Sequence, residues 1–206
     1  MKEKRSPVRF IREELFLLVK LNILFLITAI PVITIPAALT SMMKILTERL
    51  RGRETDVIPD YFLYLRVSFF TSLRAGILIA VSFTLFGYVL WFYQTAESAS
   101  ALMLGALRGT ASVQVVIVYL TGCYLNVVEA VADLPFLTAV GKSFQLMIVY
   151  LRQTLLCLLA GVILFGGFFL LFPYSLPFAG VIGVSLWCAI VAFYVFPVVE
   201  MHIPLN

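Results

Sequence analysis

Five long runs of apolar, uncharged residues alternate with shorter polar stretches along the chain. The runs cover residues 21–43, 75–96, 109–128, 153–172 and 178–199. Each has about 20 residues, and because an α-helix rises about 1.5 Å per residue, each matches a hydrocarbon core about 30 Å thick. The composition agrees, since 62% of the 206 residues are hydrophobic and only 13% are charged. The pattern predicts an all-α, polytopic helical membrane protein built as a single membrane domain.

The first apolar run differs from the others because two prolines, Pro31 and Pro36, lie near its middle. Proline lacks a backbone N–H, its ring clashes with the carbonyl group four residues earlier, and the residue before it avoids helical geometry. We therefore expect two half-helices, at residues 15–30 and 37–50, joined by an irregular segment at 30–36. Lipid cannot bond the carbonyl groups freed there, so protein or water must surround this segment.

The positions of lysine and arginine leave two arrangements of the first run open. Twelve of the 15 basic residues lie before residue 75, on both sides of the run, and the other three are Arg108, Lys142 and Arg152. A kinked helix that crosses once would place one basic flank outside, against the positive-inside rule. A re-entrant segment would keep both flanks in the cytoplasm. The charges favour the re-entrant form, and the frequency of proline in membrane helices keeps the kinked crossing open.

The remaining four runs predict four full transmembrane helices arranged as two hairpins. By the same rule, the turns near 94–100 and 173–177 face outward, and the C-terminus is cytoplasmic. The expected segments are a basic N-terminus (1–20), the Pro-broken segment (21–46), a basic loop with an amphipathic helix (47–74), the first hairpin (75–128), a cytoplasmic connector (129–152) and the second hairpin (153–200).

The two hairpins share a weak sequence pattern. Residues 59–129 and 135–200 each begin with proline, carry a basic residue close before Ser-Phe, at Arg66 and Lys142, and end with Val-Val-Glu. Each unit is about 70 residues long and is expected to start and end on the same side, as in a parallel repeat. Shared chemistry at the membrane interface explains the same matches, so both interpretations stay open.

Polar residues in and around the broken segment are the candidates for an intramembrane site. Threonine hydroxyls can bond the carbonyl groups that the prolines free, and non-helical backbone at membrane depth often forms substrate and ion sites. The candidates are Asn22, Thr28, Pro31, Thr34, Pro36 and Thr40.

The loop after this segment predicts a basic, aromatic surface at the cytoplasmic interface. Phe62, Leu65 and Phe69 share one face of a helix, as in amphipathic helices that lie at headgroup depth. A lipid anchor is the favoured interpretation, and docking of a second protein is the alternative. The residues expected in this surface are Arg49, Arg51, Arg53, Phe62, Arg66 and Phe69.

Small residues recur at every fourth position in the return helix of the first hairpin, a pattern that favours close packing of two helices. They are Ala101, Gly105 and Gly109. Arg108 is expected near the outer end of the same helix, where its side chain can reach water. Three carboxylates are expected to be solvated at the inner boundary: Glu129, Asp133 and Glu200.

Residues that carry common catalytic or metal chemistry are scarce. His202 is the only histidine, so no histidine-based nucleophile or zinc cluster is expected. Cys123, Cys157 and Cys188 lie in apolar runs without metal or redox spacing and are expected to be buried. We find no nucleotide-binding glycine motif. The sequence therefore predicts no catalytic residues, cofactor or metal, and membrane lipids instead of nucleic acid as the partner of the basic N-terminus.

A set of features in the first third of the chain resembles a known family. Leu21-Asn22 precedes the broken run, which contains Pro-Val-Ile-Thr-Ile at 31–35 and Thr40, and spaced aromatic residues continue to Phe70. These features resemble the opening of the YesL family of bacterial membrane proteins. The resemblance implies a bacterial plasma membrane location and an association with carbohydrate ABC uptake systems, without a known biochemical activity. Pro36 stands where the family more often has glycine.

Two functional hypotheses follow. The first is a non-enzymatic accessory or interaction protein of a membrane complex, with ABC transporter subunits or a second copy of itself as partners. The second is a small transporter or channel with its site at the Pro31–Pro36 break, reached by a polar cavity near Thr34. The scarcity of charged residues within the apolar runs favours the first hypothesis, because coupled transporters usually carry ionisable groups at membrane depth.

Overall fold

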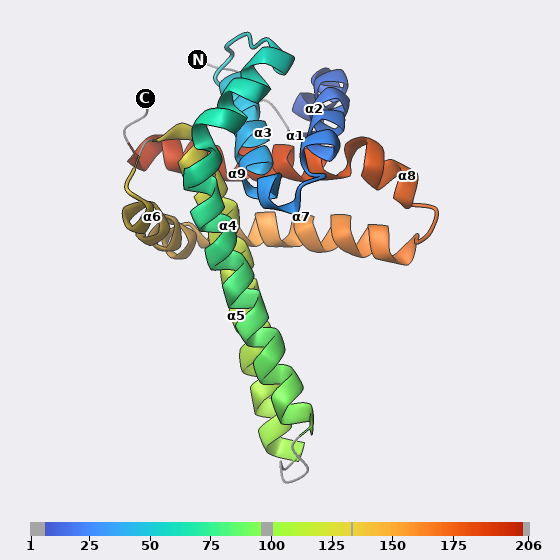
Figure 1. Cartoon of the computed structure of the whole chain (residues 1–206), viewed down its shortest axis with the longest axis vertical. Helices are drawn as coiled ribbons and strands as arrows, with labels where there is room; N and C mark the ends of the chain where they lie inside the picture. The colour runs from blue at the N-terminus through green and yellow to red at the C-terminus, as the bar shows by residue number, and fades with distance from the viewer. Residues whose placement is uncertain (1–6, 96–100, 133, 204–206) are drawn as a thin grey trace.

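The computed structural model describes residues 7–95, 101–132 and 134–203, and these ranges are mostly helical and contain no strand (Figure 1). The predicted all-α fold is confirmed. The elements in chain order are α1 (Pro7–Glu13), α2 (Leu15–Thr28), the 3-10 turn η1 (Val32–Thr34), α3 (Ile35–Leu50), α4 (Val57–Thr95), α5 (Ala101–Val131), α6 (Phe136–Val149), α7 (Leu151–Leu170), α8 (Leu176–Phe178), the π-helical turn η2 (Ala179–Gly183) and α9 (Val184–His202).

Four helical stretches of the described residues are long and apolar enough to cross a membrane. They are Val57–Val89, Gly105–Val131, Leu151–Leu170 and Leu176–His202. Large apolar side chains cover much of their outer surface, and Phe169 and Leu170, for example, are 83% and 84% exposed. Apolar surface on this scale is unfavourable in water and is matched by lipid. The chain is therefore a multi-pass membrane protein, as its apolar runs predict.

The four stretches form two hairpins that extend in different directions (Figure 1). α4 and α5 pair to form a long arm, while α7, α8 and α9 form a second hairpin that runs across the direction of the arm. α4 has 39 residues, which at ~1.5 Å per residue is about twice the thickness of a hydrocarbon core. The amphipathic helix expected within residues 47–74 is therefore not separate, because it is the first part of α4.

The second hairpin is preceded by a separate helix. α6 ends at Val149 and α7 begins at Leu151, and the residue between them, Tyr150, has φ −105° and ψ 53°. The Tyr150 hydroxyl lies 2.9 Å from Nε2 of His202, so the end of α9 is bonded to this bend. The two halves thus each place a helical segment before a hairpin, and they differ at the junction, which is bent in the second half and continuous in the first.

The first apolar run forms α2, η1 and α3, so the break that the prolines predict is present. α2 ends at Thr28 and α3 begins at Ile35, which makes the break shorter than expected at its second end. Figure 1 shows the two half-helices as an antiparallel pair with the break at one end. The segment therefore turns back on itself, which is the geometry that a re-entrant arrangement needs.

Pro36 has a different role from the predicted one. It lies in the first turn of α3, where a missing N–H is harmless because the first four N–H groups of a helix have no partner within it. Pro36 therefore begins a helix. Its ring packs against α4, and a β-carbon added to Gly76 would lie 2.2 Å from Cγ of Pro36. The glycine allows α3 and α4 to approach this closely.

The hydrophobic core lies where α2, α3, α5 and α9 meet, and α3 contacts each of the other three. Leu21 of α2, Met42 of α3, Val127 of α5 and Val195 of α9 are fully buried there. The re-entrant pair is therefore held among other helices, as irregular backbone at membrane depth requires. The three cysteines are buried in this core, as expected: Cys123, Cys157 and Cys188.

Candidate functional site

The threonines of the broken segment bond to backbone carbonyl groups. Thr28 donates to the carbonyl of Leu24 at 2.8 Å, and its hydroxyl lies 2.8 Å from that of Tyr61 on α4. Thr34 donates to the carbonyls of Thr28 and Pro31. The polar atoms that were candidates for an intramembrane site are thus used to close the break itself.

The surroundings of the break are apolar. Ile30, Val32 and Ile33 are 79%, 76% and 57% exposed, so their side chains face outward from the molecule. Pro31, which follows the end of α2, adopts an extended conformation with φ −78° and ψ 108°. The break therefore presents hydrocarbon to its surroundings, and its hydroxyl groups are turned toward its own backbone.

Asn22, the first of the predicted site residues, is a fully buried connector between α2 and the second hairpin. Its Oδ1 atom accepts hydrogen bonds from the backbone N–H groups of Val184, at 3.1 Å, and Ser185, at 3.0 Å. Its Nδ2 atom donates to the carbonyl of Gly180 in the π-helical turn. One amide thus satisfies three backbone groups where η2 passes into α9.

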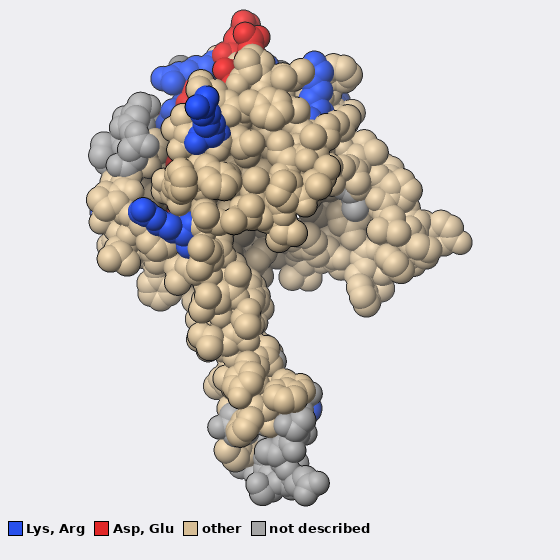
Figure 2. Space-filling model, viewed as in Figure 1, with Lys and Arg blue, Asp and Glu red and all other residues tan. Residues whose placement is uncertain are grey.

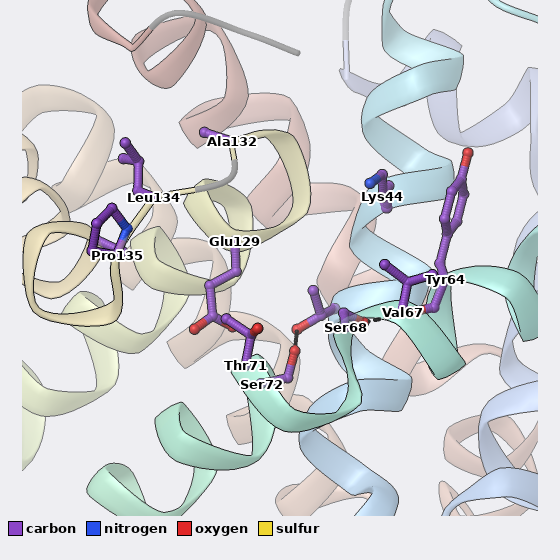
Figure 3. A pocket seen from close by; sticks show the side chains of 12 residues that line it. Lys44, Tyr64, Val67, Ser68, Thr71, Ser72, Glu129, Ala132, Leu134 and Pro135 are labelled. Atoms are coloured by element: carbon purple, nitrogen blue, oxygen red, sulfur yellow. Dashed lines mark hydrogen bonds between the residues drawn. The ribbon is translucent and has the colours of Figure 1, made fainter.

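A polar cavity of about 340 Å³ lies between α3, α4, α5 and the start of α6 (Figure 3). Lys44 contributes from α3, Ser68 and Ser72 from α4, and Glu129 from α5. Thr40, one helical turn before Lys44, also lines it. Thr40 is the one predicted site residue that reaches this cavity, so the cavity lies beside the second half-helix and away from the break.

Glu129 is the most unusual group in the cavity. Both of its carboxylate oxygens are buried, and neither has a hydrogen-bond partner among the described residues. Figure 3 shows the carboxylate pointing toward Thr71 and Ser72 of α4. The prediction that Glu129 is solvated at the membrane boundary is therefore wrong. Glu200 is 46% exposed, as predicted, and Asp133 lies outside the described residues.

The hydroxyl groups of the cavity direct their protons toward the protein. Ser72 donates to Oγ1 of Thr40 at 2.9 Å, and Thr40 donates to the carbonyl of Pro36 at 3.2 Å. Ser68 donates to the carbonyl of Tyr64 at 2.6 Å. These side chains can therefore offer the lone pairs of their oxygen atoms to a ligand. Lys44 lies with its amine 4.8 Å from the centre of the Tyr64 ring.

Sequence reasoning missed this cavity, although a signal was present. Thr40 and Lys44 are four residues apart, as are Ser68 and Ser72, so each pair lies on one face of its helix. Two facing helices with such polar pairs favour a polar contact between them. Glu129 gave no comparable signal, because its burial depends on how α5 packs against α4 and α6.

The arginines of the predicted cytoplasmic surface differ in their surroundings. Arg51 is only 10% exposed and lies 2.9 Å from Glu48, with its guanidinium 5.3 Å from the centre of the Phe196 ring. Arg53 also bonds Glu48, at 3.0 Å, and Arg49 donates to the carbonyl of Thr55 at 3.3 Å. Arg51 is therefore part of the interior, and it joins the end of α3 to α9.

The aromatic part of that surface does come together. Phe62, Arg66 and Phe69 line one shallow hollow on α4 with Leu65 and Phe70. This arrangement agrees with the predicted shared face of Phe62, Leu65 and Phe69. Lys and Arg residues gather at the end of the molecule that carries this part of α4, while the arm is almost free of charge on the side shown in Figure 2.

Two of the three small residues of α5, Gly105 and Gly109, make no close contact with another helix in the described part of the chain. A β-carbon added to Gly105 or Gly109 would meet no atom within 4 Å, and the side chain of Ala101 is not among those described. Close packing occurs instead at Gly161, where a β-carbon would lie 2.7 Å from the Tyr119 hydroxyl. The close helix packing that the small-residue pattern predicts is therefore not seen at Gly105 or Gly109 among the described residues. Arg108 is exposed, as expected.

The part of the chain that the structure describes holds few residues that could support catalysis or bind a metal ion. There, no three residues among histidine, cysteine, aspartate and glutamate come together in a way that could hold a metal ion. The cavity would bind a ligand mainly through oxygen atoms, because its lining has a carboxylate and several hydroxyl groups beside a single amine.

Comparisons with known proteins locate a similarity in the first part of the chain. No curated protein and no solved structure matches it. A family model described as "Protein of unknown function, DUF624" matches residues 18–92, roughly a third of the chain. The match runs from α2 through the break and α3 to the outer part of α4, and over these residues the chain is similar to that family of unknown function.

Proposed function

We propose that this protein is a non-enzymatic accessory or interaction subunit of a membrane complex, and that the complex is a carbohydrate uptake system of the ABC type. The observation that carries the proposal is the arm formed by α4 and α5. Beyond the centre of the molecule the two helices are paired only with each other (Figure 1), and their outward side chains, such as Leu85 and Val113, are apolar and exposed.

The arm offers features suited to a partner helix. Gly105 and Gly109 lie four residues apart on α5 and have no neighbour at their β positions. Such glycines let a second transmembrane helix approach closely, and association in lipid depends on this close packing. A partner that spans the membrane is therefore a better match than a soluble protein for this part of the surface.

The link to carbohydrate uptake comes from the resemblance to the YesL family in the broken run and the loop after it. That region overlaps residues 18–92, which match the family of unknown function. The bacterial plasma membrane, with the basic end of the molecule and the C-terminus in the cytoplasm, is part of the same proposal. The clustering of Lys and Arg at one end of the molecule supports this orientation.

The alternative is a small transporter or channel with its site at the Pro31–Pro36 break. The contacts of the break support it less well than the accessory role. The hydroxyl groups of Thr28 and Thr34 donate hydrogen bonds to neighbouring carbonyl groups, and the side chains that face outward are apolar. A substrate at the break would therefore meet few free polar atoms.

The test is purification of the tagged, full-length protein from native membranes in a mild detergent. We expect permease subunits of an ABC importer to co-elute in stoichiometric amounts. The matched control is the double variant Gly105→Leu/Gly109→Leu, which should lose the partner while keeping the melting temperature of the isolated protein, because neither glycine has a neighbour within the chain.

Two outcomes would contradict the accessory role. One is elution without any membrane partner under conditions that keep other importers intact. The other is solute flux through the purified protein alone in liposomes, which would favour the transporter hypothesis.

A further inference from the structure

We propose that the cavity between α3, α4, α5 and α6 binds a small monovalent cation through the Glu129 carboxylate and the hydroxyl oxygens of Thr71 and Ser72. The cation is an alkali metal ion or the primary ammonium group of an ethanolamine lipid. This inference is independent of the accessory role, since Glu129 lies at the end of α5, whereas Gly105 and Gly109 lie near its start.

The charge of Glu129 is the first reason to expect a bound cation. A buried carboxyl group is costly in its charged form unless a cation or several hydrogen-bond donors accompany it, and otherwise it takes up a proton. Both oxygens of Glu129 are buried without a partner among the described residues. A bound cation would supply the missing compensation, and the carboxylate would supply the strongest ligand for it.

Lys44 does not fill this role. It lines the same cavity, but no ion pair within 4.0 Å joins it to Glu129 in the part of the chain that is described. Figure 3 shows the two side chains well apart, with Lys44 near Tyr64 and Glu129 beside Thr71. The amine instead lies 4.8 Å from the centre of the Tyr64 ring, where the electron-rich face of the ring attracts it.

The direction of the hydrogen bonds made by the cavity hydroxyl groups is the second reason to expect a cation. Ser72 gives its proton to Thr40, and Thr40 gives its own to the carbonyl of Pro36. The Ser72 oxygen therefore keeps lone pairs for a ligand. A group that needs acceptors on every side, such as a metal ion or an ammonium, suits this set of oxygens better than a second anion does.

The number of carboxylates sets the charge of the ion. Hard cations bind to oxygen, and calcium usually takes six to eight such ligands with several carboxylates among them. Glu129 is the one carboxylate among the described residues that line the cavity, and Lys44 adds a positive charge to it. A single negative charge beside a lysine is matched to a monovalent ion. The volume of about 340 Å³ leaves room for that ion with several waters.

The experiment measures thermal unfolding of the full-length protein in detergent as a function of added salt. Sodium, potassium and ethanolammonium chloride are compared with choline chloride at equal ionic strength. Choline carries a bulky quaternary group without N–H donors, so it controls for ionic strength alone. We expect a saturable rise in melting temperature with at least one of the three small cations and none with choline.

Variants assign the effect to the cavity. Glu129→Gln should abolish the rise, and Glu54→Gln, which alters an exposed carboxylate, should leave it unchanged. Ser72→Ala removes one oxygen ligand and should weaken the apparent affinity about tenfold, the order expected for one hydrogen bond or ligand contact to a charged group. If Glu129→Gln does not fold, Ser72→Ala decides the question.

The three salts also separate the two sources of the cation. A response to ethanolammonium alone, reproduced in nanodiscs with ethanolamine lipids and lost in choline lipids, identifies a headgroup. A response to sodium or potassium in either lipid identifies a free ion. Equal melting temperatures in all four salts would overturn the proposal. A rise that persists in Glu129→Gln, or that keeps the same apparent affinity in Ser72→Ala, would also overturn it.

Discussion

Pro36 of α3 and Gly76 of α4 are in closer contact than a side chain at position 76 would allow. A β-carbon on Gly76 would lie 2.2 Å from Cγ and 2.9 Å from Cβ of Pro36. The proline ring is rigid and sits in the first turn of α3, so it cannot move aside as the end of a long side chain can. This contact fixes the re-entrant segment against the first full transmembrane helix.

The contact predicts the effect of a methyl group at position 76. Gly76→Ala should lower the free energy of unfolding by about 1–3 kcal/mol, because overpacking forces the two helices apart. The measurement is the thermal unfolding of the purified protein in detergent. Gly87→Ala is the matched control, since Gly87 lies on the same helix with no atom within 4 Å of an added β-carbon. A Gly76→Ala protein as stable as Gly87→Ala would contradict the packing described.

Asn22 should be important for the stability of the second hairpin. Asn22→Leu keeps a similar volume but removes three hydrogen bonds to backbone groups of residues 180–185. With about 1 kcal/mol for each lost bond, we expect a destabilisation of about 2–3 kcal/mol.

The control for this substitution is Asn126→Leu. Asn126 donates only to the carbonyl of Gly122 one turn earlier on its own helix, so its loss should cost much less. Hydrogen exchange of the backbone at 180–185 should also rise in Asn22→Leu and remain unchanged in Asn126→Leu. Equal stability of the two variants would show that Asn22 does not hold η2.

Gly161 of α7 lies against two stacked aromatic rings. Tyr119 and Trp187 have ring centres 5.7 Å apart, and a β-carbon at position 161 would lie 2.7 Å from the Tyr119 hydroxyl and 3.0 Å from the Trp187 ring. Gly161→Ala should displace the rings and cost about 1–2 kcal/mol. In a Trp91→Phe background the fluorescence of Trp187 reports the displacement directly. Gly166→Ala, where the β position is open, should leave the spectrum unchanged.

Glu48 should stabilise the basic end of the molecule. It lies 2.9 Å from Arg51, which is only 10% exposed, and 3.0 Å from Arg53. Glu48→Gln would leave the more distant Glu200, 4.0 Å away and 46% exposed, as the remaining counter-charge of the largely buried Arg51 guanidinium. We expect a loss of about 2 kcal/mol, below the cost of breaking a fully buried pair. Glu54→Gln alters an exposed carboxylate and should have no measurable effect. Equal stability of Glu48→Gln and Glu54→Gln at low salt would contradict this role of Glu48.

Much of the fold follows from the sequence because the governing signals are local. The length of each apolar run predicts the four membrane-crossing helices, and Pro31 predicts the end of α2. The role of Pro36 could not be predicted in the same way. A proline that breaks a helix and one that begins a helix look alike in sequence, and the contact with Gly76 that distinguishes them comes from tertiary packing.

The candidate site was less predictable. Asn22 was expected in an intramembrane polar site because it is a polar residue in an apolar run. Its partners lie about 160 residues away on η2 and α9, so its structural role has no sequence signal. Glu129 was expected to be solvated because it ends an apolar run. Its burial depends on three other elements that enclose it, and no local pattern encodes their arrangement.

The central claim is that the first apolar run enters and leaves the membrane on one side, so that four full crossings follow it. Cysteine labelling in sealed cells tests this claim most directly. A protein in which the three native cysteines are replaced would carry one new cysteine at Ser6, Thr55 or Ser98. An impermeant thiol reagent should label position 98 in sealed cells, and positions 6 and 55 only after permeabilisation. Labelling of position 6 together with 98 in sealed cells would contradict the re-entrant arrangement.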